Sequence, residues 1–285
     1  MPIVDLRMQH FRSFTDESFE FGQSVNIIVG ANASGKTNLL EALLVVCRGA
    51  SYRAKDSELI QFEQPWARLD SRGDSERVVK LAREPATNKL YEIDGKPYRR
   101  LTMQHSVPVV LFEPTHLQLL SGSPELRRNY LDELLEQTEA GYASRLRQFK
   151  RTLSQRNALL KRGAHEAATQ LFPWNIRLSE LSAEVARSRA RLIERLNGQI
   201  GSLYKDLSHT RTGISLVYRA GFDLETYETR MIHKLEADAS VDIARGFTGT
   251  GAHREDFSVL FDDHLAESTA SRGEARTLVL GLKIL

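Results

Sequence analysis

The sequence predicts an α/β fold in which a lobe of strands and helices is drawn from both ends of the chain and is interrupted by a helical block. Short strand-like runs and turn signals fill roughly the first 112 residues. Long helical patterns with few breakers follow, and strand-like and helical runs return after residue 211. We therefore expect three segments, residues 1–122, 123–210 and 211–285, with the first and third forming one lobe.

Composition leaves the function open but excludes several classes of protein. A chain of 285 residues fits one large or two ordinary domains, and its formal net charge of +2 neither demands nor excludes nucleic acid. Cys47 is the single cysteine, which excludes an internal disulfide and a cysteine-based metal site. The chain has no apolar run of membrane-spanning length and does not open with a signal peptide, so we expect a cytoplasmic location.

The N-terminal segment is expected to form a sheet. Its strand-like runs are 3–10, 16–21, 25–29, 66–72, 77–83, 89–98 and 106–112. The first three are expected to pair with one another, the next three to form an antiparallel meander, and the last to be a buried strand. Asp94-Gly95 is a strong hairpin signal within the meander. A helix over 38–47 follows the third strand and ends at Gly49.

The middle segment reads as helical. Ser123-Pro124-Glu125 is a helix start, with an N-cap residue, a proline at the first position and an acid in the first turn. Helices are expected over about 124–162 and 175–208, with Gly141, Gly163 and Pro173 as the breakers. An apolar stripe at helical spacing predicts core packing along the second of them: Leu178, Leu181, Val185, Leu192, Leu196, Leu203 and Leu207. In the third segment we expect strands at 214–219 and 257–261 and a helix over 273–285.

A glycine-rich stretch carries the first chemical signal. Its residues are Gly30, Ala31, Asn32, Ala33, Ser34, Gly35, Lys36 and Thr37. The pattern G-x-x-x-x-G-K-T between a strand and a helix is that of a phosphate-binding loop, in which backbone N–H groups and the helix N-terminus surround an anion. Lys36 would reach the β- and γ-phosphates of a nucleoside triphosphate, and Thr37 would bind Mg²⁺. The alternative is a chance Gly/Ser turn. Arg48 and Arg53 follow the loop's helix and could touch nucleotide, but we expect solvated loop charges.

A second motif, near the end of the chain, can also bind an anion. Ser271, Arg272, Gly273 and Glu274 open an apolar helix. The turn resembles the signature motif of ABC-type and SMC-like ATPases, in which the serine hydroxyl and glycine N–H bind the γ-phosphate of ATP held by another subunit. By itself an N-cap serine followed by glycine is common.

Taken in order, the motifs resemble the RecF family of bacterial SMC-like DNA repair ATPases. They are Phe11-Arg12, the phosphate loop with its NLLEA continuation, Leu111–Leu117, Gly122–Asp132, Leu153–Lys161, Thr250–Asp256 and the signature motif. The resemblance implies a P-loop ABC/SMC-type lobe, with a mixed sheet that is antiparallel at its N-terminal end, and a helical insertion lobe. It implies ATP and Mg²⁺ as cofactors and slow DNA-stimulated ATP hydrolysis.

The resemblance also implies partners. The family binds double-stranded DNA and gap junctions as an ATP-dependent homodimer and acts with RecR and RecO to load recombinase at gaps. The alternatives are another ABC-type ATPase with a helical insertion and an ATP-binding remnant without turnover. Candidate DNA contacts lie in the basic helical segment: Arg145, Arg151, Arg156, Arg187 and Arg191. For each of them a solvated helix face is the alternative.

The chain departs from the family pattern at three places. Ala33 stands where the family usually has glycine, which matters only if this position needs a positive φ. Ala252 replaces the proline of the Gly-Pro-His-Arg motif, a mild change in loop stiffness. The family's apolar strand ending in acids is expected after the signature helix, and the chain stops first. We therefore expect a C-terminally truncated member with impaired hydrolysis. Asp262 and Asp263 follow an apolar run but are expected to be turn residues.

Overall fold

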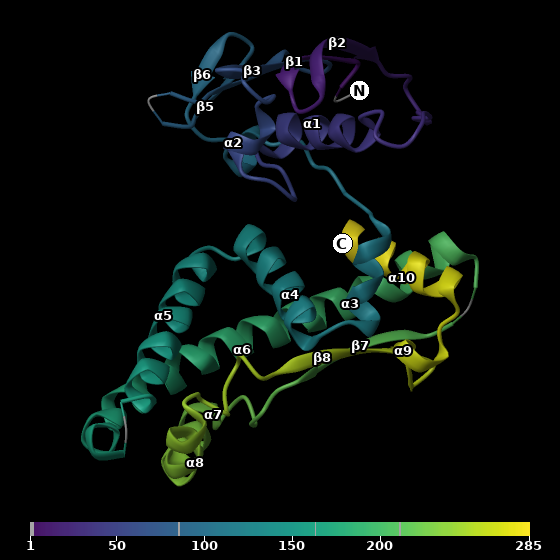
Figure 1. Ribbon diagram of the computed structural model, residues 1–285. Helices are drawn as coiled ribbons and strands as arrows, with labels where there is room; N and C mark the ends of the chain where they lie inside the picture. The colour runs from purple at the N-terminus through teal and green to yellow at the C-terminus, as the bar shows by residue number, and fades with distance from the viewer. Residues whose placement is uncertain (1–2, 85, 163, 211) are drawn as a thin grey trace. The chain divides into compact units, whose positions relative to one another are not determined.

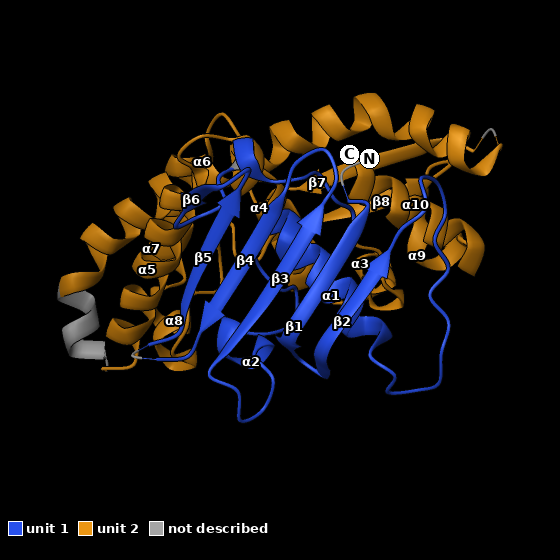
Figure 2. Cartoon of the chain, turned by 90° about the horizontal axis from the view of Figure 1, so that it is seen from above, with its two compact units in different colours: residues 1–110 blue, residues 111–285 orange. Residues whose placement is uncertain are grey.

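The computed structural model describes residues 3–84, 86–162, 164–210 and 212–285. Gly163, one of the expected breakers, lies outside these ranges. The chain divides into two compact units, residues 1–110 and 111–285 (Figure 2). The α/β class is confirmed, and the N-terminal sheet is antiparallel as expected.

Unit 1 is built on a six-stranded antiparallel sheet (Figure 1). Its strands, in the order β2-β1-β3-β4-β5-β6, are Phe14–Glu20, Asp5–Phe11, Trp66–Arg72, Arg77–Ala82, Asn88–Ile93 and Lys96–Tyr98. The predicted meander is confirmed. Asp94 and Gly95 have φ of 49° and 75°, so the short turn between β5 and β6 has the left-handed geometry that this residue pair favours.

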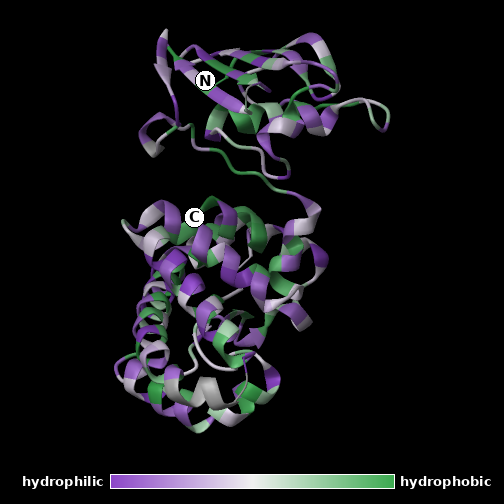
Figure 3. Ribbon diagram, turned by 60° about the vertical axis from the view of Figure 1, so that its left-hand side comes forward, coloured by the Kyte–Doolittle hydropathy of each residue, from purple (hydrophilic) through white to green (hydrophobic). Residues whose placement is uncertain are grey.

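Helix α1, Lys36–Arg48, packs on one face of this sheet. Leu6 and Met8 of β1 and Leu69 of β3 form a buried core with Val45 and Val46 of α1. Residues that alternate with these along the strands point to the opposite face, and Figure 3 shows the resulting alternation of hydrophilic and hydrophobic colour. Gly49 ends α1 in the left-handed conformation, as predicted. A short helix, α2 (Asp56–Leu59), and the 3₁₀ turn Met103–His105 complete the unit.

Two expected strands of the N-terminal segment are absent, and both predictions are wrong. Residues 25–29 form no strand, and Val25, Ile27 and Val29 are about 80% exposed. Residues 106–112 include the connection between the two units and also form no strand; this segment is coloured hydrophobic in Figure 3. An apolar run becomes a strand only where a neighbouring strand takes its N–H and C=O groups, and within the described residues neither segment has such a neighbour.

Unit 2 is organised around one long helix, α6, Ala164–Ser208. Packed against it are α4 (Pro124–Thr138), α5 (Tyr142–Leu160), α7 (Tyr227–Ala237), α10 (Arg272–Ile284) and strand β7 (Ile214–Arg219). Strand β7 pairs with β8 (Asp256–Phe261), and β8 pairs with β9 (His264–Leu265) in a three-stranded antiparallel sheet. The shorter elements are the 3₁₀ turn Pro114–Leu117, α3 (Gln118–Ser121), α8 (Ala239–Arg245) and α9 (Ala266–Thr269).

Several predictions for unit 2 are confirmed, and one is wrong. Ser123 caps α4 with Pro124 at its first position, and Gly141, with φ of 81°, separates α4 from α5. Pro173, however, lies inside α6 rather than at its start. Tertiary packing of the helix thus outweighs the hydrogen bond that proline removes. The apolar stripe on α6 is core, since Leu178, Val185 and four of the other five members are buried or half-buried, whereas Leu207 is 37% exposed.

The acidic pair after β8 is a turn, as predicted. Asp262 and Asp263 have φ of 44° and 67° and link β8 to β9. Asp262 Oδ1 accepts a hydrogen bond of 2.7 Å from Gly213 N, which ties the turn to the residue before β7. The expected division into residues 1–122, 123–210 and 211–285 stays a prediction. In the described part of the chain, no helix is both long and apolar enough to span a bilayer.

Candidate functional site

The glycine-rich stretch forms a tight loop that opens helix α1. Gly35 is the N-cap residue of α1, with φ of 91°. A Cβ on Gly35 would stand 2.7 Å from the ring of Phe14 and 3.2 Å from Ser13 Oγ, so only glycine fits between this helix start and the β1–β2 turn. Residues 30–34 are exposed, and the N-terminal end of α1 therefore faces solvent. Such an end attracts anions because its N–H groups are unpaired and the helix dipole is positive there.

Lys36 is folded back over this loop. Its Nζ donates hydrogen bonds to the carbonyl oxygens of Gly30 (2.8 Å) and Ala31 (2.6 Å). The ammonium group thus lies across the mouth of the loop, where a lysine of this pattern meets phosphate oxygens. The loop and its lysine therefore place an ammonium group beside the solvent-facing N-terminal end of α1, and residues 30–37 are called the cradle below.

Ala33, which stands where the family usually has glycine, has a positive φ, so the replacement affects the backbone at this position. Its φ is 63°, in the left-handed region that glycine adopts without cost. An alanine in this conformation is strained by about 1 kcal/mol or more. The loop geometry therefore persists in this chain, but at a local cost that glycine would remove.

Thr37, the expected Mg²⁺ ligand, is the second residue of α1 and is exposed. Among the described residues, no group of three or more His, Cys, Asp or Glu side chains could hold a metal ion. The donor set still fits Mg²⁺, because this ion commonly takes few protein oxygens and completes its shell with phosphate oxygens and water. Thr37 would hold the ion beside the phosphates.

A buried carboxylate on α1, to which the sequence motifs assign no role, binds two arginines. Glu41 is fully buried and accepts hydrogen bonds from Arg12 Nε and Nη2, both at 2.9 Å, and from Arg53 Nη2 at 3.0 Å. Ser51 Oγ adds a third donor at 2.5 Å. Burial alone would raise the pKa of Glu41, but these donors outweigh it and lower the pKa to about 2.

The same network corrects one expectation. Arg53 is not a solvated loop charge, since it also donates to Asn38 Oδ1 at 2.8 Å, and Asn38 Nδ2 donates to Ser13 Oγ at 2.9 Å. The available signal was a carboxylate inside the otherwise apolar run Leu39 to Val46. A charged residue on a buried helix face requires a partner, and the identity of that partner depends on the tertiary fold.

The second motif opens α10 in unit 2. Ser271 caps the helix: its Oγ accepts from Glu274 N at 3.3 Å, and Glu274 Oε2 accepts from Ser271 N at 2.8 Å. Ser271, Arg272 and Gly273 are exposed. Because Ser271 Oγ accepts in this capping box, its own O–H remains able to donate to an external anion.

The five arginines proposed to contact DNA occupy different environments. Arg151 is exposed on α5. Arg145 and Arg191 pair with Glu139, and Arg187 binds both carboxylate oxygens of Glu228 at 2.7 Å.

Arg156 is fully buried, and this corrects its assignment as a DNA contact. It donates to Asn175, Asp242 and Thr248 at 2.7 to 2.8 Å. Its guanidinium is therefore enclosed by unit 2 and serves the packing of α5, α6 and α8. Arg156 and Arg151 lie in the same basic helical stretch, so their sequence surroundings do not distinguish the buried side chain from the exposed one.

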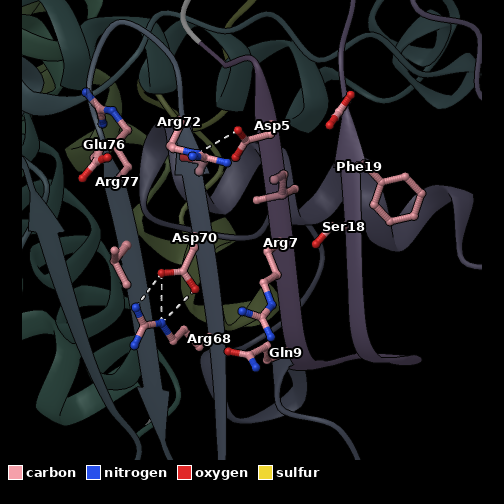
Figure 4. Close-up of a pocket in the computed structure, with 14 residues that line it drawn as sticks. Asp5, Arg7, Gln9, Ser18, Phe19, Arg68, Asp70, Arg72, Glu76 and Arg77 are labelled. Atoms are coloured by element: carbon pink, nitrogen blue, oxygen red, sulfur yellow. Dashed lines mark hydrogen bonds and ion pairs between the residues drawn. The ribbon is translucent and has the colours of Figure 1, made fainter.

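A hollow of about 500 Å³ lies on the sheet face of unit 1 that points away from α1 (Figure 4). It is lined by four arginines and four carboxylates, so its charges balance. Arg68 binds Asp70 and Arg72 binds Asp5, as the dashed lines show, which leaves no excess positive charge to attract a polyanion.

Comparison with known proteins identifies the family to which the fold and the glycine-rich loop belong. The family model described as "AAA domain" matches residues 5–192. The DNA replication and repair protein RecF of Heliobacterium modesticaldum is 33% identical over 295 residues, covering 100% of this chain and 79% of the relative. RecF of a Synechococcus strain is 32% identical with the same coverage. The solved structure of the recombination mediator protein RecF with ATP matches with a TM-score of 0.77 and 26% identity, over 99% of this chain and 79% of that one.

Proposed function

The chain belongs to the RecF family of DNA replication and repair proteins, and from this premise we propose that it binds ATP with Mg²⁺ and uses the nucleotide to form a DNA-binding dimer. The observation that carries the proposal is the cradle at residues 30–37. There Gly35 caps α1 and the Lys36 ammonium spans the loop mouth within 2.8 Å of two carbonyl oxygens. ATP binding by the solved relative supports this assignment.

In the proposed site the loop binds the triphosphate through N–H groups of residues 30–37. Lys36 exchanges its bonds to Gly30 O and Ala31 O for bonds to the β- and γ-phosphates. Thr37 adds a hydroxyl ligand to Mg²⁺, which offsets phosphate charge. Each lysine–phosphate hydrogen bond contributes roughly 1.5–3 kcal/mol.

The dimer is proposed to complete the site with Ser271 to Glu274 of a second copy. The exposed Ser271 hydroxyl and Gly273 N–H at the start of α10 would meet the γ-phosphate. Two such sites related by a two-fold axis would make ATP the bridge between the protomers.

Double-stranded DNA at gap junctions is the proposed ligand of the dimer, and RecR and RecO are its proposed partners in loading recombinase. Arg151 and Arg191 are exposed, and Arg145, Arg187 and Arg191 could exchange their carboxylate partners for DNA phosphates. Glu139 and Glu228 are half-buried, so such an exchange would leave each carboxylate to find solvent or another donor.

The test combines size-exclusion chromatography with light scattering and a gel shift on gapped duplex DNA, each with and without MgATP. We expect a monomer without nucleotide, a dimer with MgATP, and DNA retention only in the second case. Lys36→Ala should abolish both responses. ATP-independent DNA binding by a monomer, or the same behaviour in Lys36→Ala, would contradict the proposal. ATP turnover, measured in the same samples as phosphate release, separates a hydrolysing dimer from one that only binds ATP.

A further inference from the structure

Three sequence motifs that the proposed ATP site does not use meet at one loop of unit 2. The loop, residues 246–255, joins α8 to β8 (Figure 1), and the motif Thr250–Asp256 begins within it. The motif Leu153–Lys161 at the end of α5 and the motif Gly122–Asp132 at the start of α4 each donate a hydrogen bond to this loop. Segments far apart in the chain therefore fix one short loop, and a loop held by a rigid scaffold is well suited to recognition.

Buried groups fix the backbone of this loop. Thr248 donates from its N and Oγ1 to Asn157 Oδ1, at 2.8 and 2.7 Å, and its Oγ1 accepts from the buried Arg156 at 2.7 Å. Further along the loop, Ala252 O accepts at 2.7 Å from Arg189, which is also buried. Two guanidinium groups have thus left bulk water to hold this backbone, so the side chains on the outside of the loop are positioned before a ligand arrives.

The outer side of the loop presents an aromatic ring and a cation. Phe247 is 41% exposed, and Arg254 is exposed with its Cζ 5.1 Å from the centre of the Phe247 ring. The Arg254 guanidinium donates only a long hydrogen bond, of 3.4 Å, to Thr248 O, and no carboxylate in the described ranges forms an ion pair with it. Both side chains are therefore available to a ligand from solvent.

Arg128 of α4 adds a second cation. It is half-buried, donates to a backbone carbonyl of the loop at 2.9 Å, and pairs with no carboxylate among the described residues. Burial lowers the pKa of Arg128 first, and neighbouring arginines, among them Arg254, lower it further. Asp256 and Glu125 act in the opposite direction, but Arg127 already binds Asp256 through two bonds of 2.8 Å. The charge of the two arginines is thus only partly balanced, which favours an anion here.

We infer that the 246–255 loop and Arg128 form a binding site for single-stranded nucleic acid, in which Arg128 and Arg254 meet backbone phosphates and a base stacks beside Phe247. The inference rests on the proposed DNA-binding function and names a site for the single strand of a gap. Bases stack on phenyl rings and on guanidinium planes, and stacking together with cations holds a single strand whatever its sequence. An acidic peptide would use the cations but leave the ring exposed.

The test measures, by fluorescence anisotropy with MgATP, the affinity for a labelled oligothymidine, for an abasic strand of the same length and for a duplex. Phe247→Ala should weaken oligothymidine binding about 10-fold and leave the other two affinities unchanged, because duplex bases are already stacked and an abasic strand has none. Arg254→Gln should weaken binding of both single strands and reduce their salt slope by about 0.7. Equal affinity of the unsubstituted chain for oligothymidine and the abasic strand, or unchanged oligothymidine binding in Phe247→Ala, would overturn the inference.

Two further variants test stacking directly. Phe172 on α6 is 55% exposed, so Phe172→Ala removes a comparable ring from another part of unit 2 and should leave all three affinities unchanged. Phe247→Trp should keep oligothymidine binding and show indole quenching by oligothymidine beyond that of the unsubstituted chain, but none by the abasic strand. Equal losses in Phe172→Ala and Phe247→Ala, or no added quenching in Phe247→Trp, would contradict a stacking site at Phe247.

The remaining outcomes separate this site from the proposed function. If Arg254→Gln does not fold, Phe247→Ala and Arg128→Gln decide, and unchanged oligothymidine affinity in both would overturn the inference. Displacement of oligothymidine by polyglutamate as readily as by unlabelled oligothymidine would indicate a general polyanion site and would also overturn it. Duplex binding without oligothymidine binding by the unsubstituted chain would overturn this inference alone, whereas absence of binding to every DNA would overturn the proposed function as well.

Discussion

Ser271 and Glu274 cap helix α10 reciprocally: the Ser271 hydroxyl oxygen accepts from Glu274 N, and the Glu274 carboxylate accepts from Ser271 N. The bond from the Ser271 backbone holds the pKa of Glu274 below its usual value. The carboxylate is thereby kept on the helix start, while the serine O–H is left able to donate outward. The same residue therefore has a structural task and a proposed nucleotide-binding task that can be tested separately.

Two substitutions at Ser271 separate these tasks. Ser271→Ala removes the cap and should cost about 1 kcal/mol, a fall in melting temperature of roughly 2–4 °C for a unit of this size. Ser271→Asp keeps a capping oxygen but places a negative charge where the γ-phosphate is proposed to lie. We expect Ser271→Asp to be as stable as the unsubstituted chain yet to form no ATP-dependent dimer by light scattering. A normal dimer in Ser271→Asp would contradict the composite site.

Ala33→Gly should stabilise the phosphate loop. Ala33 has φ of 63°, so glycine relieves left-handed strain, although it also adds freedom to the unfolded chain. We expect a net gain of about 0.5–1 kcal/mol in the free energy of unfolding by urea denaturation. Ala31→Gly, at a loop position without a positive φ, is the control and should give no gain. A loss of stability in Ala33→Gly would contradict the inference that the backbone is strained at Ala33.

The stability supplied by Glu41 should depend on pH in the acid range. The folded-state pKa is about 2, below the unfolded value near 4.5, so the contribution is complete above pH 4.5 and is lost as the pH falls towards 2. At neutral pH it amounts to about 3 kcal/mol. The difference in unfolding free energy between the unsubstituted chain and Glu41→Gln should therefore be constant from pH 5 to 7 and shrink below pH 4.5. A difference that grows on acidification would contradict this network.

Arg151 and Arg156 should respond in opposite ways. Arg151→Ala removes an exposed cation, so we expect several-fold weaker DNA binding in MgATP and a salt dependence reduced by about one ion, with unchanged stability. Arg156→Met leaves Asp242 buried without its partner and should cost roughly 3–5 kcal/mol of stability. Fluorescence anisotropy against salt concentration, together with thermal denaturation, checks both. A selective loss of DNA binding in a stable Arg156→Met protein would contradict the burial of this arginine.

Asp263→Gly should strengthen the β8–β9 hairpin. Asp262 and Asp263 both have positive φ, and glycine at the second position suits such a turn. We expect a gain of about 0.5 kcal/mol in unfolding free energy and no change in ATP affinity. A marked fall in Mg²⁺-dependent ATP binding would instead indicate that the acidic pair serves the metal ion.

Much of the fold follows from local pattern. The meander β3–β6, the hairpin at Asp94-Gly95, helices α4, α5 and α10, and strands β7 and β8 are close to their predicted ranges. In each of these elements, the turn residues and the apolar periodicity favour the same structure as the packing around the element. The failures occur where the outcome depends on a neighbour: residues 25–29 and 106–112 have strand-like composition but no pairing strand among the described residues, and Pro173 is carried within a helix that packs along its length.

For the site, the sequence by itself determined the family, and it predicts the phosphate loop and the signature motif, because the spacing of glycine, lysine, threonine and serine follows local backbone geometry and the chemistry of phosphate. Only the tertiary structure decided which charged side chains are exposed enough to meet a ligand and which backbone positions are strained. It enclosed Arg156, joined Arg53 to Glu41 and Asn38, and gave Ala33 its positive φ. The physical reason is that the role of a charged side chain is set by its solvation and its partners, and residues far apart in the chain supply both.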